Sequence, residues 1–162
     1  MKQLILVRHG KSSWEYSVND KDRPLLLRGI KDGHLVTSAF HKGDQQIDAA
    51  YSSPANRALH TCMIVLRGLD FPFSKLEISN ALYDFSGDSV LHFIKNLDDR
   101  LDTVLLFGHN HAFTYLANSL GNEYIDNVPT SGLVQLSFDI TNWADLNEGT
   151  TIQTIFPKHL KK

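Results

Sequence analysis

The stretch Leu4-Ile5-Leu6-Val7-Arg8-His9-Gly10 decides the fold of this chain. Its four apolar residues are uninterrupted and β-prone, the pattern of a strand buried on both faces of a parallel sheet. Short apolar runs at residues 47–51 and 103–107 predict two more such strands. Residues 133–138 alternate instead, and with residues 151–156 they could form an antiparallel pair near a sheet edge.

Helices are expected between these strands. One is predicted to begin with Ser53 as its N-cap and Pro54 as its first helical residue. Another is expected to end at Gly121, and a less regular one to cover residues 27–41. The apolar positions that define the buried helix faces are Ala58, Cys62, Val65, Leu66 and Leu69; Phe113, Leu116, Ala117 and Leu120; and Val90, Ile94 and Leu97. This alternation predicts an α/β three-layer sandwich, with helices on both faces of a mostly parallel central sheet.

Length and composition exclude several other classes of protein. The 162 residues, 42% of them hydrophobic, fit one globular domain over residues 1–162. A formal net charge of -2 argues against nonspecific nucleic-acid binding. The lone Cys62 cannot form an internal disulfide or a cysteine metal site. No apolar run approaches the ~18 residues of a membrane span, so we expect a cytoplasmic protein without membrane partners.

Chemically useful side chains follow three of the predicted strands. Arg8 and His9 end the first, His109 follows the run at 103–107, and Arg57 lies one turn into the helix after the run at 47–51. Parallel strands end at one edge of their sheet, so all four are expected to line one cleft. Arginine offers a bidentate fork to phosphate oxygens, and histidine can be a nucleophile. The pattern therefore indicates a phosphate site.

Each of these residues also has a simpler explanation. Arg8 could sit in a surface ion pair at a strand-ending turn, Arg57 could be solvated, and His109 could be a core histidine bonded to backbone. Their joint placement at strand ends favours the phosphate site. The pair His109 and His111 could suggest a metal, but acidic or cysteine partners at ligand spacing are missing. We therefore expect neither a metal nor a cofactor.

Four motifs now point to a family. They are Arg-His-Gly-x-Ser-x-Trp at residues 8–14, Pro-Leu-x-x-x-Gly at 24–29, Ser-x-x-x-Arg-Ala-x-x-Thr at 53–61, and Gly-His at 108–109. Their types and order resemble the histidine phosphatase superfamily, which contains the cofactor-dependent phosphoglycerate mutases and the histidine acid phosphatases. The resemblance implies a phosphoglycerate mutase-like fold. It also implies that His9 takes the phosphoryl group while Arg8, Arg57 and His109 hold its oxygens.

The chain is too short for the insertions that cover the pocket in the larger relatives. It is most similar to the small branch typified by the SixA-like phosphohistidine phosphatases, which residues 22–25 and 82–84 also fit. By this resemblance, Ser12 and Asn110 are further candidate phosphate ligands. Asp84 stands where a glutamate acid is usual. It could be the general acid, or it could cap the helix ahead of Val90.

Three functions remain open at this point. The leading one is a phosphatase acting through His9 on phosphohistidine in a protein, because imidazole is a leaving group that needs little help from an acid. The second is a phosphatase for small phosphate esters, which would need Asp84 as a proton donor. The third is a module that only binds a phosphorylated partner, although binding alone does not need a nucleophile.

Overall fold

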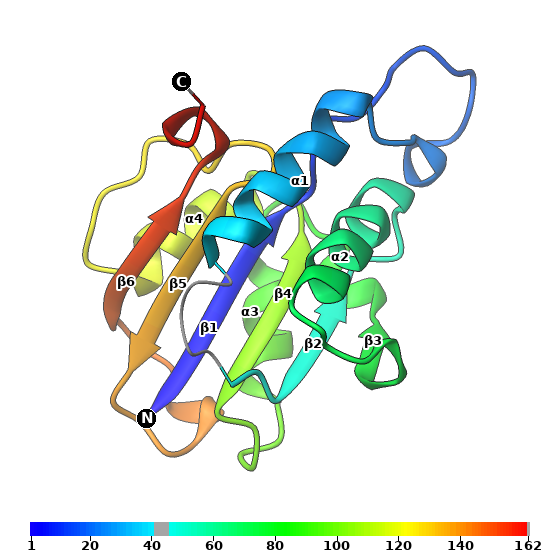
Figure 1. Ribbon diagram of the computed structural model, residues 1–162. Helices are drawn as coiled ribbons and strands as arrows, with labels where there is room; N and C mark the ends of the chain where they lie inside the picture. Colours follow the sequence, from blue (N-terminus) through cyan, green and yellow to red (C-terminus); the bar gives the residue numbers. More distant parts are fainter. Residues whose placement is uncertain (41–45, 162) are drawn as a thin grey trace.

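The computed structural model describes residues 1–40 and 46–161 (Figure 1). In this part of the chain a six-stranded sheet has the order β3-β2-β4-β1-β5-β6. The strands are β1 (Lys2–Arg8), β2 (Ala49–Ser52), β3 (Leu76–Ile78), β4 (Thr103–Gly108), β5 (Leu133–Phe138) and β6 (Thr150–Ile155). The helices are α1 (Leu27–Phe40), α2 (Asn56–Gly68), α3 (Asp88–Lys95) and α4 (Ala112–Leu120). Short 3-10 turns are η1 (Asp20–Asp22), η2 (Phe73–Lys75), η3 (Asn80–Leu82), η4 (Trp143–Asp145) and η5 (Pro157–His159).

Strand β1 is buried on both faces, as its uninterrupted apolar run predicts. Leu4 and Leu6 belong to one apolar core and Ile5 and Val7 to the other, because successive side chains of a strand point to opposite faces. Helices α3 and α4 cover the first face, and α1 and α2 cover the second, so the molecule has three layers (Figure 1). The prediction of an α/β sandwich is confirmed.

The sheet is mostly parallel, as predicted. Strand β1 pairs parallel with β4, β4 with β2, and β2 with β3. Strand β5 pairs antiparallel with both β1 and β6, so only β5 runs against the others. The predicted antiparallel pair at a sheet edge is therefore also confirmed. No helix among the described residues is long and apolar enough to cross a membrane.

Some predicted boundaries were wrong. Helix α2 begins at Asn56 with Ala55 as its N-cap, not at Ser53, because Ser53 continues the strand direction and donates its N–H to the carbonyl of Phe107. Helix α3 ends at Lys95 and leaves Leu97 outside. Strand β3 was not predicted, since it has three residues and is half-exposed or exposed throughout. The expected helix end at residue 41 lies outside the described residues.

Two glycines allow a close approach between α1 and the segment that follows β1. A Cβ on Gly10 would lie 3.0 Å from the carbonyl oxygen of Gly29, and a Cβ on Gly29 would lie 2.5 Å from that of Lys11. Backbone atoms cannot move aside as the end of a side chain can. The start of α1 is therefore pressed directly against the backbone next to His9.

We expect Gly29→Ala to lower the free energy of unfolding by about 1–3 kcal/mol, as overpacking against backbone does. Gly33→Ala in the same helix is the matched control. Its Cβ would meet only the Ile64 side chain, at 3.3 Å, and alanine favours the helix by about 1 kcal/mol. Denaturant unfolding of both variants measures the difference; equal stability would show that α1 can shift freely at its start.

Candidate phosphate site

The pairing of β1 with β4 brings two histidines together at the carboxyl edge of the sheet. Arg8 lies opposite Gly108, and the N–H of His9 donates to the Gly108 carbonyl at 3.1 Å. The chain then places His109 beside His9, with ring centroids 5.2 Å apart. His9 is almost completely buried and His109 completely so. The two motifs that were far apart in the sequence thus form one site.

Arg57 comes to the same site from the first turn of α2. It is buried, and its two Nη atoms donate to Asp20 in η1, to the carbonyl at 2.6 Å and to a carboxylate oxygen at 2.9 Å. Arg8 is held in a similar way, because its Nη1 donates to the carbonyl of Val128 at 2.8 Å. Both guanidinium groups are therefore fixed at their Nη end.

His9 is prepared to act as a nucleophile. Its Nδ1 lies 2.7 Å from the carbonyl oxygen of Gly10, which can only accept, so Nδ1 carries the proton and Nε2 keeps its lone pair. Burial, together with the charges of Arg57 and Arg8, lowers the pKa of His9 to about 4 against the opposing effect of the bond to Gly10. The ring is consequently neutral at pH 7.

His109 is a neutral hydrogen-bond donor. Its Nε2 lies 2.8 Å from the hydroxyl of Ser53, which already accepts from the N–H of Ala55. In the tautomer that uses the hydroxyl proton, Ser53 donates to Nε2 and the ring's own proton lies on Nδ1. Burial lowers the pKa of His109 to about 3, with His9 and Arg57 acting in the same direction. The residue predicted as a helix cap thus orients a histidine.

Four buried polar atoms of residues around His9 have no hydrogen-bond partner. They are Nε of Arg8, Nε of Arg57, Nδ1 of His109 and Oγ of Ser131. The other such atom among the described residues, Oδ1 of Asp32, lies 2.8 Å from the Lys161 ammonium. Buried polar atoms are nearly always satisfied in proteins. A cluster of donors around one histidine is therefore complementary to an anion with several oxygens.

Two candidate phosphate ligands have other partners. The Ser12 hydroxyl accepts from Nη2 of Arg23 at 2.6 Å, which leaves it only its own proton to donate. The Asn110 side chain accepts from Thr114 at the start of α4 and donates to Asn127. Asn110 therefore joins α4 to the segment that holds Arg8, and its position does not fit a phosphate ligand.

Asp84 has the capping role that was its alternative reading. One carboxylate oxygen accepts from the N–H and hydroxyl of Ser86, and the other accepts from the N–H groups of Gly87 and Val90. These bonds outweigh the effect of burial and lower the pKa of Asp84. A carboxylate bound in this way is a poor proton donor at neutral pH, so the structure argues against Asp84 as the general acid.

Sequence reasoning missed or left unassigned several residues of the site. Asp20 gave no signal, since an acidic residue is not expected beside a phosphate. Arg23 lies within the motif at 22–25, but only the structure shows that it is buried and donates to Asp20. Ser131 has a left-handed backbone, φ 62°, and its N–H donates to the carbonyls of Arg8 and His9. No sequence pattern marks such a serine.

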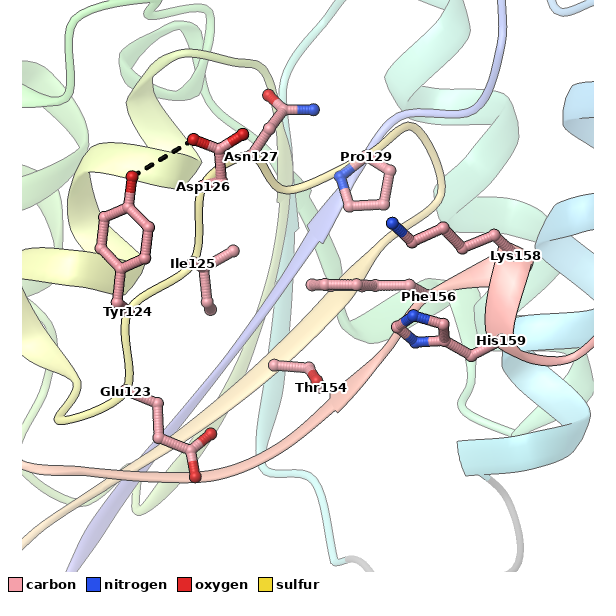
Figure 2. A pocket seen from close by; sticks show the side chains of 10 residues that line it. All are labelled: Glu123, Tyr124, Ile125, Asp126, Asn127, Pro129, Thr154, Phe156, Lys158 and His159. Atoms are coloured by element: carbon pink, nitrogen blue, oxygen red, sulfur yellow. Dashed lines mark hydrogen bonds between the residues drawn. The ribbon is translucent and has the colours of Figure 1, made fainter.

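A separate cavity of about 480 Å³ is lined by residues on either side of Val128, among them Asn127 and Pro129. Figure 2 shows Glu123, Tyr124 and Asp126 on one side of it and Lys158 and His159 on the other. None of the four residues first expected to bind phosphate lines it. Among the described residues, no three histidine, cysteine or acidic side chains gather as metal ligands would.

Comparison with known proteins agrees with this geometry. The family model described as the histidine phosphatase superfamily (branch 1) matches residues 4–90, more than half of the chain. The chain belongs to the histidine phosphatase superfamily. The matched residues of this histidine phosphatase include Arg8, His9 and Arg57, whereas His109 follows them in the sequence.

Several individual proteins are similar over nearly the whole length of this histidine phosphatase. An uncharacterized protein of Mycobacterium tuberculosis is 29% identical over 88% of this chain and 93% of its own length. The structure of the protein histidine phosphatase SixA complexed with tungstate is 25% identical, with a TM-score of 0.83, and covers 98% of this chain and 99% of that one. A SixA structure from Agrobacterium tumefaciens shares the fold, with a TM-score of 0.80 at 21% identity, over 95% of this chain and 97% of that one.

For this histidine phosphatase, we expect Asp84→Ala to lower the free energy of unfolding by about 0.5–2 kcal/mol, the usual cost of a lost N-terminal cap. The value of kcat should stay within about twofold of wild type, because the carboxylate bonds only to the backbone and to Ser86. Thermal unfolding and steady-state kinetics check both effects. A folded variant with kcat reduced by about a hundredfold would restore Asp84 as the acid.

The pKa values predict a second behaviour of the histidine phosphatase. His9, with a pKa of about 4, should stay neutral from pH 8 to pH 5 and gain a proton only below that. In the unfolded chain it binds a proton near pH 6.5, so its contribution to stability is complete above that pH and falls as the pH drops toward 4. Histidine-ring NMR of the ligand-free protein measures the titration. A midpoint near 6.5 for His9 would contradict the burial argument.

Proposed function

We propose that this protein is a phosphatase that transfers a phosphoryl group to His9 and then to water. The observation behind the proposal is the set of unpartnered buried donors on Arg8, Arg57, His109 and Ser131 around a neutral His9. A phosphoryl group in transfer develops charge on its equatorial oxygens, and fixed donors stabilise that charge without reorganising. The complex of the similar SixA protein with tungstate, itself an oxyanion, supports the same assignment.

The steps of phosphoryl transfer follow from the position of the proton on the His9 ring. The Nε2 lone pair of His9 attacks phosphorus as the bond to the leaving group breaks. Arg8, Arg57 and His109 donate to the phosphoryl oxygens throughout. Water then attacks the phosphorus, the P–N bond to His9 breaks, and inorganic phosphate leaves. The proton stays on Nδ1, hydrogen-bonded to the Gly10 carbonyl, so His9 returns to its starting tautomer when the P–N bond breaks.

We further propose that the substrate is phosphohistidine in a protein. Two acidic side chains could be considered as the acid, and both are charged: Asp84 caps α3, and Asp20 is paired with Arg57. An alkyl ester leaves as a strongly basic alkoxide that needs a positioned acid. Transfer from a substrate imidazole to His9 instead exchanges one P–N bond for another, and so has little need of one. Neither Asp84 nor Asp20 is held as a proton donor, and this favours phosphohistidine.

The test offers the purified protein a phosphohistidine peptide, an aryl phosphate and an alkyl phosphate side by side. We expect kcat/KM for the alkyl ester to be at least about 10²-fold below the other two, since a general acid contributes 10²–10⁴-fold. His9→Ala should abolish turnover and the acid-labile phosphoenzyme. His34→Ala, which removes an exposed histidine of α1, is the matched control and should retain both.

The outcomes separate the three functions considered for the sequence. Fast cleavage of the alkyl ester would contradict the phosphohistidine proposal and favour an enzyme for small phosphate esters. Phosphate binding without turnover on any substrate would favour a binding module. Unchanged turnover in His9→Ala would exclude His9 as the nucleophile.

A further inference from the structure

Asp20 is the point at which three segments around the pocket are joined. One carboxylate oxygen accepts from Nη2 of Arg57 at 2.9 Å and from the Tyr83 hydroxyl at 2.5 Å. The other accepts from Nη1 of Arg23 at 3.0 Å. The ring of Tyr83 in turn packs edge-on against His109, with centroids 5.3 Å apart. A single acidic side chain thus contacts or supports most of the cationic and aromatic wall.

The hold on Arg57 determines which edge of its guanidinium is free. Each Nη atom donates one hydrogen bond to Asp20, one to its carbonyl and one to its carboxylate, whereas the buried Nε has no partner. Arg8 shows the same division, with Nη1 on the Val128 carbonyl and Nε without a partner. A guanidinium is rigid and planar, so fixing one edge also fixes the direction of the other.

We propose that Asp20 is a positioning residue of the phosphatase, which clamps the Nη edge of Arg57 and so presents its Nε edge to the phosphoryl group. This rests on the proposed function and adds a residue to it. Asp20 does not donate a proton. Burial alone would raise the pKa of its carboxyl group, but the hydrogen bonds from Tyr83, Arg57 and Arg23 outweigh burial and lower it.

The opposite role would be a carboxylate that occupies the phosphate position and must leave before substrate binds. Two observations argue against it. The Asp20 side chain is 41% exposed, whereas the unpartnered donors lie in the buried interior, so the carboxylate stands at the rim of the site. Its neighbour Arg23 is also fixed on its far side, by the Ser13 carbonyl and the Ser12 hydroxyl. The protein's own hydrogen bonds are thus sufficient to assemble the clamp.

Because the clamp carries a negative charge, its removal should affect phosphate binding and kcat differently. The charge of Asp20 repels a phosphate dianion, so removing it should leave phosphate binding unchanged or make it tighter. Loss of the clamp lets Arg57 turn, and misplaced groups in the transition state reduce kcat. A defect of folding would weaken both quantities together.

The experiment compares Asp20→Asn with Asp22→Asn, using an aryl phosphate as substrate and inorganic phosphate as competitive inhibitor. Both variants lose one negative charge from η1, but the exposed Asp22 side chain makes no contact with Arg57. We expect Asp20→Asn to lower kcat about ten- to a hundredfold while the inhibition constant of phosphate stays equal or falls. Asp22→Asn should stay within about twofold of wild type in both.

A double-mutant cycle with Arg57→Ala identifies the route of the effect. If Asp20 acts through Arg57, Asp20→Asn should change kcat little further once Arg57 is absent. Full additivity, an unchanged kcat in Asp20→Asn, or a raised kcat would each overturn the clamp. A wild-type protein that binds phosphate but cleaves no substrate would contradict the proposed function and the clamp with it, whereas any of the three results above in an active wild-type background would contradict the clamp alone.

Discussion

The parallel pairing of β1 with β4 is the constraint on which the site depends. Its register places Arg8 opposite Gly108, so that both strands end at the same level and their histidines become neighbours. The register is held by burial on both faces, because a shift of one residue would exchange the side chains of Leu4 and Leu6 with those of Ile5 and Val7. An apolar core thus fixes the geometry of a polar site that lies beyond it.

The site accepts a cost in stability for its preorganisation. A buried polar atom without a partner costs about 1–3 kcal/mol, and several such atoms are gathered around His9. Burial also keeps both histidines neutral beside two arginines, which concentrates positive charge on the guanidinium groups and leaves His9 with its lone pair. Low solvent exposure makes unpartnered donors costly, and it also strengthens their attraction for an anion.

The sequence was most informative where one physical rule dominates. Burial on both faces made Leu4 to Val7 recognisable as a central strand, and the common edge of parallel strands brought Arg8, His9 and His109 into one cleft. The sequence did not predict which of several possible hydrogen-bond partners a polar side chain would take. Ser53 is a residue type that often caps helices, yet its hydroxyl is hydrogen-bonded to His109. Asp84 stands at the sequence position expected for an acid, yet its oxygens cap α3.

Contacts that depend on a loop were beyond the sequence altogether. Asp20 reaches Arg57 and Tyr83 because the chain between β1 and α1 brings η1 against the start of α2 and the residue after η3, and no periodicity in the sequence predicts the path of such a segment. Strand β3 was missed for a related reason: its exposed side chains leave no apolar pattern to detect. The main strands and the candidate reactive side chains could be predicted from the sequence. The side chains that orient them could be identified only from the structure.

The exposed Trp14, on which Arg23 stacks, has a consequence for the tryptophan fluorescence of the protein. The guanidinium carbon lies 3.2 Å from the ring centre, on the same segment that bears Asp20, and Trp14 is 78% exposed. The other tryptophan, Trp143, is completely buried beneath the opposite end of the sheet, beside Lys2. Fluorescence from the two indoles therefore arises in water and in the dry interior respectively. A soluble quencher would reach the first alone, so Trp14 reports on the segment that bears Asp20 and Arg23, and Trp143 serves as the internal reference.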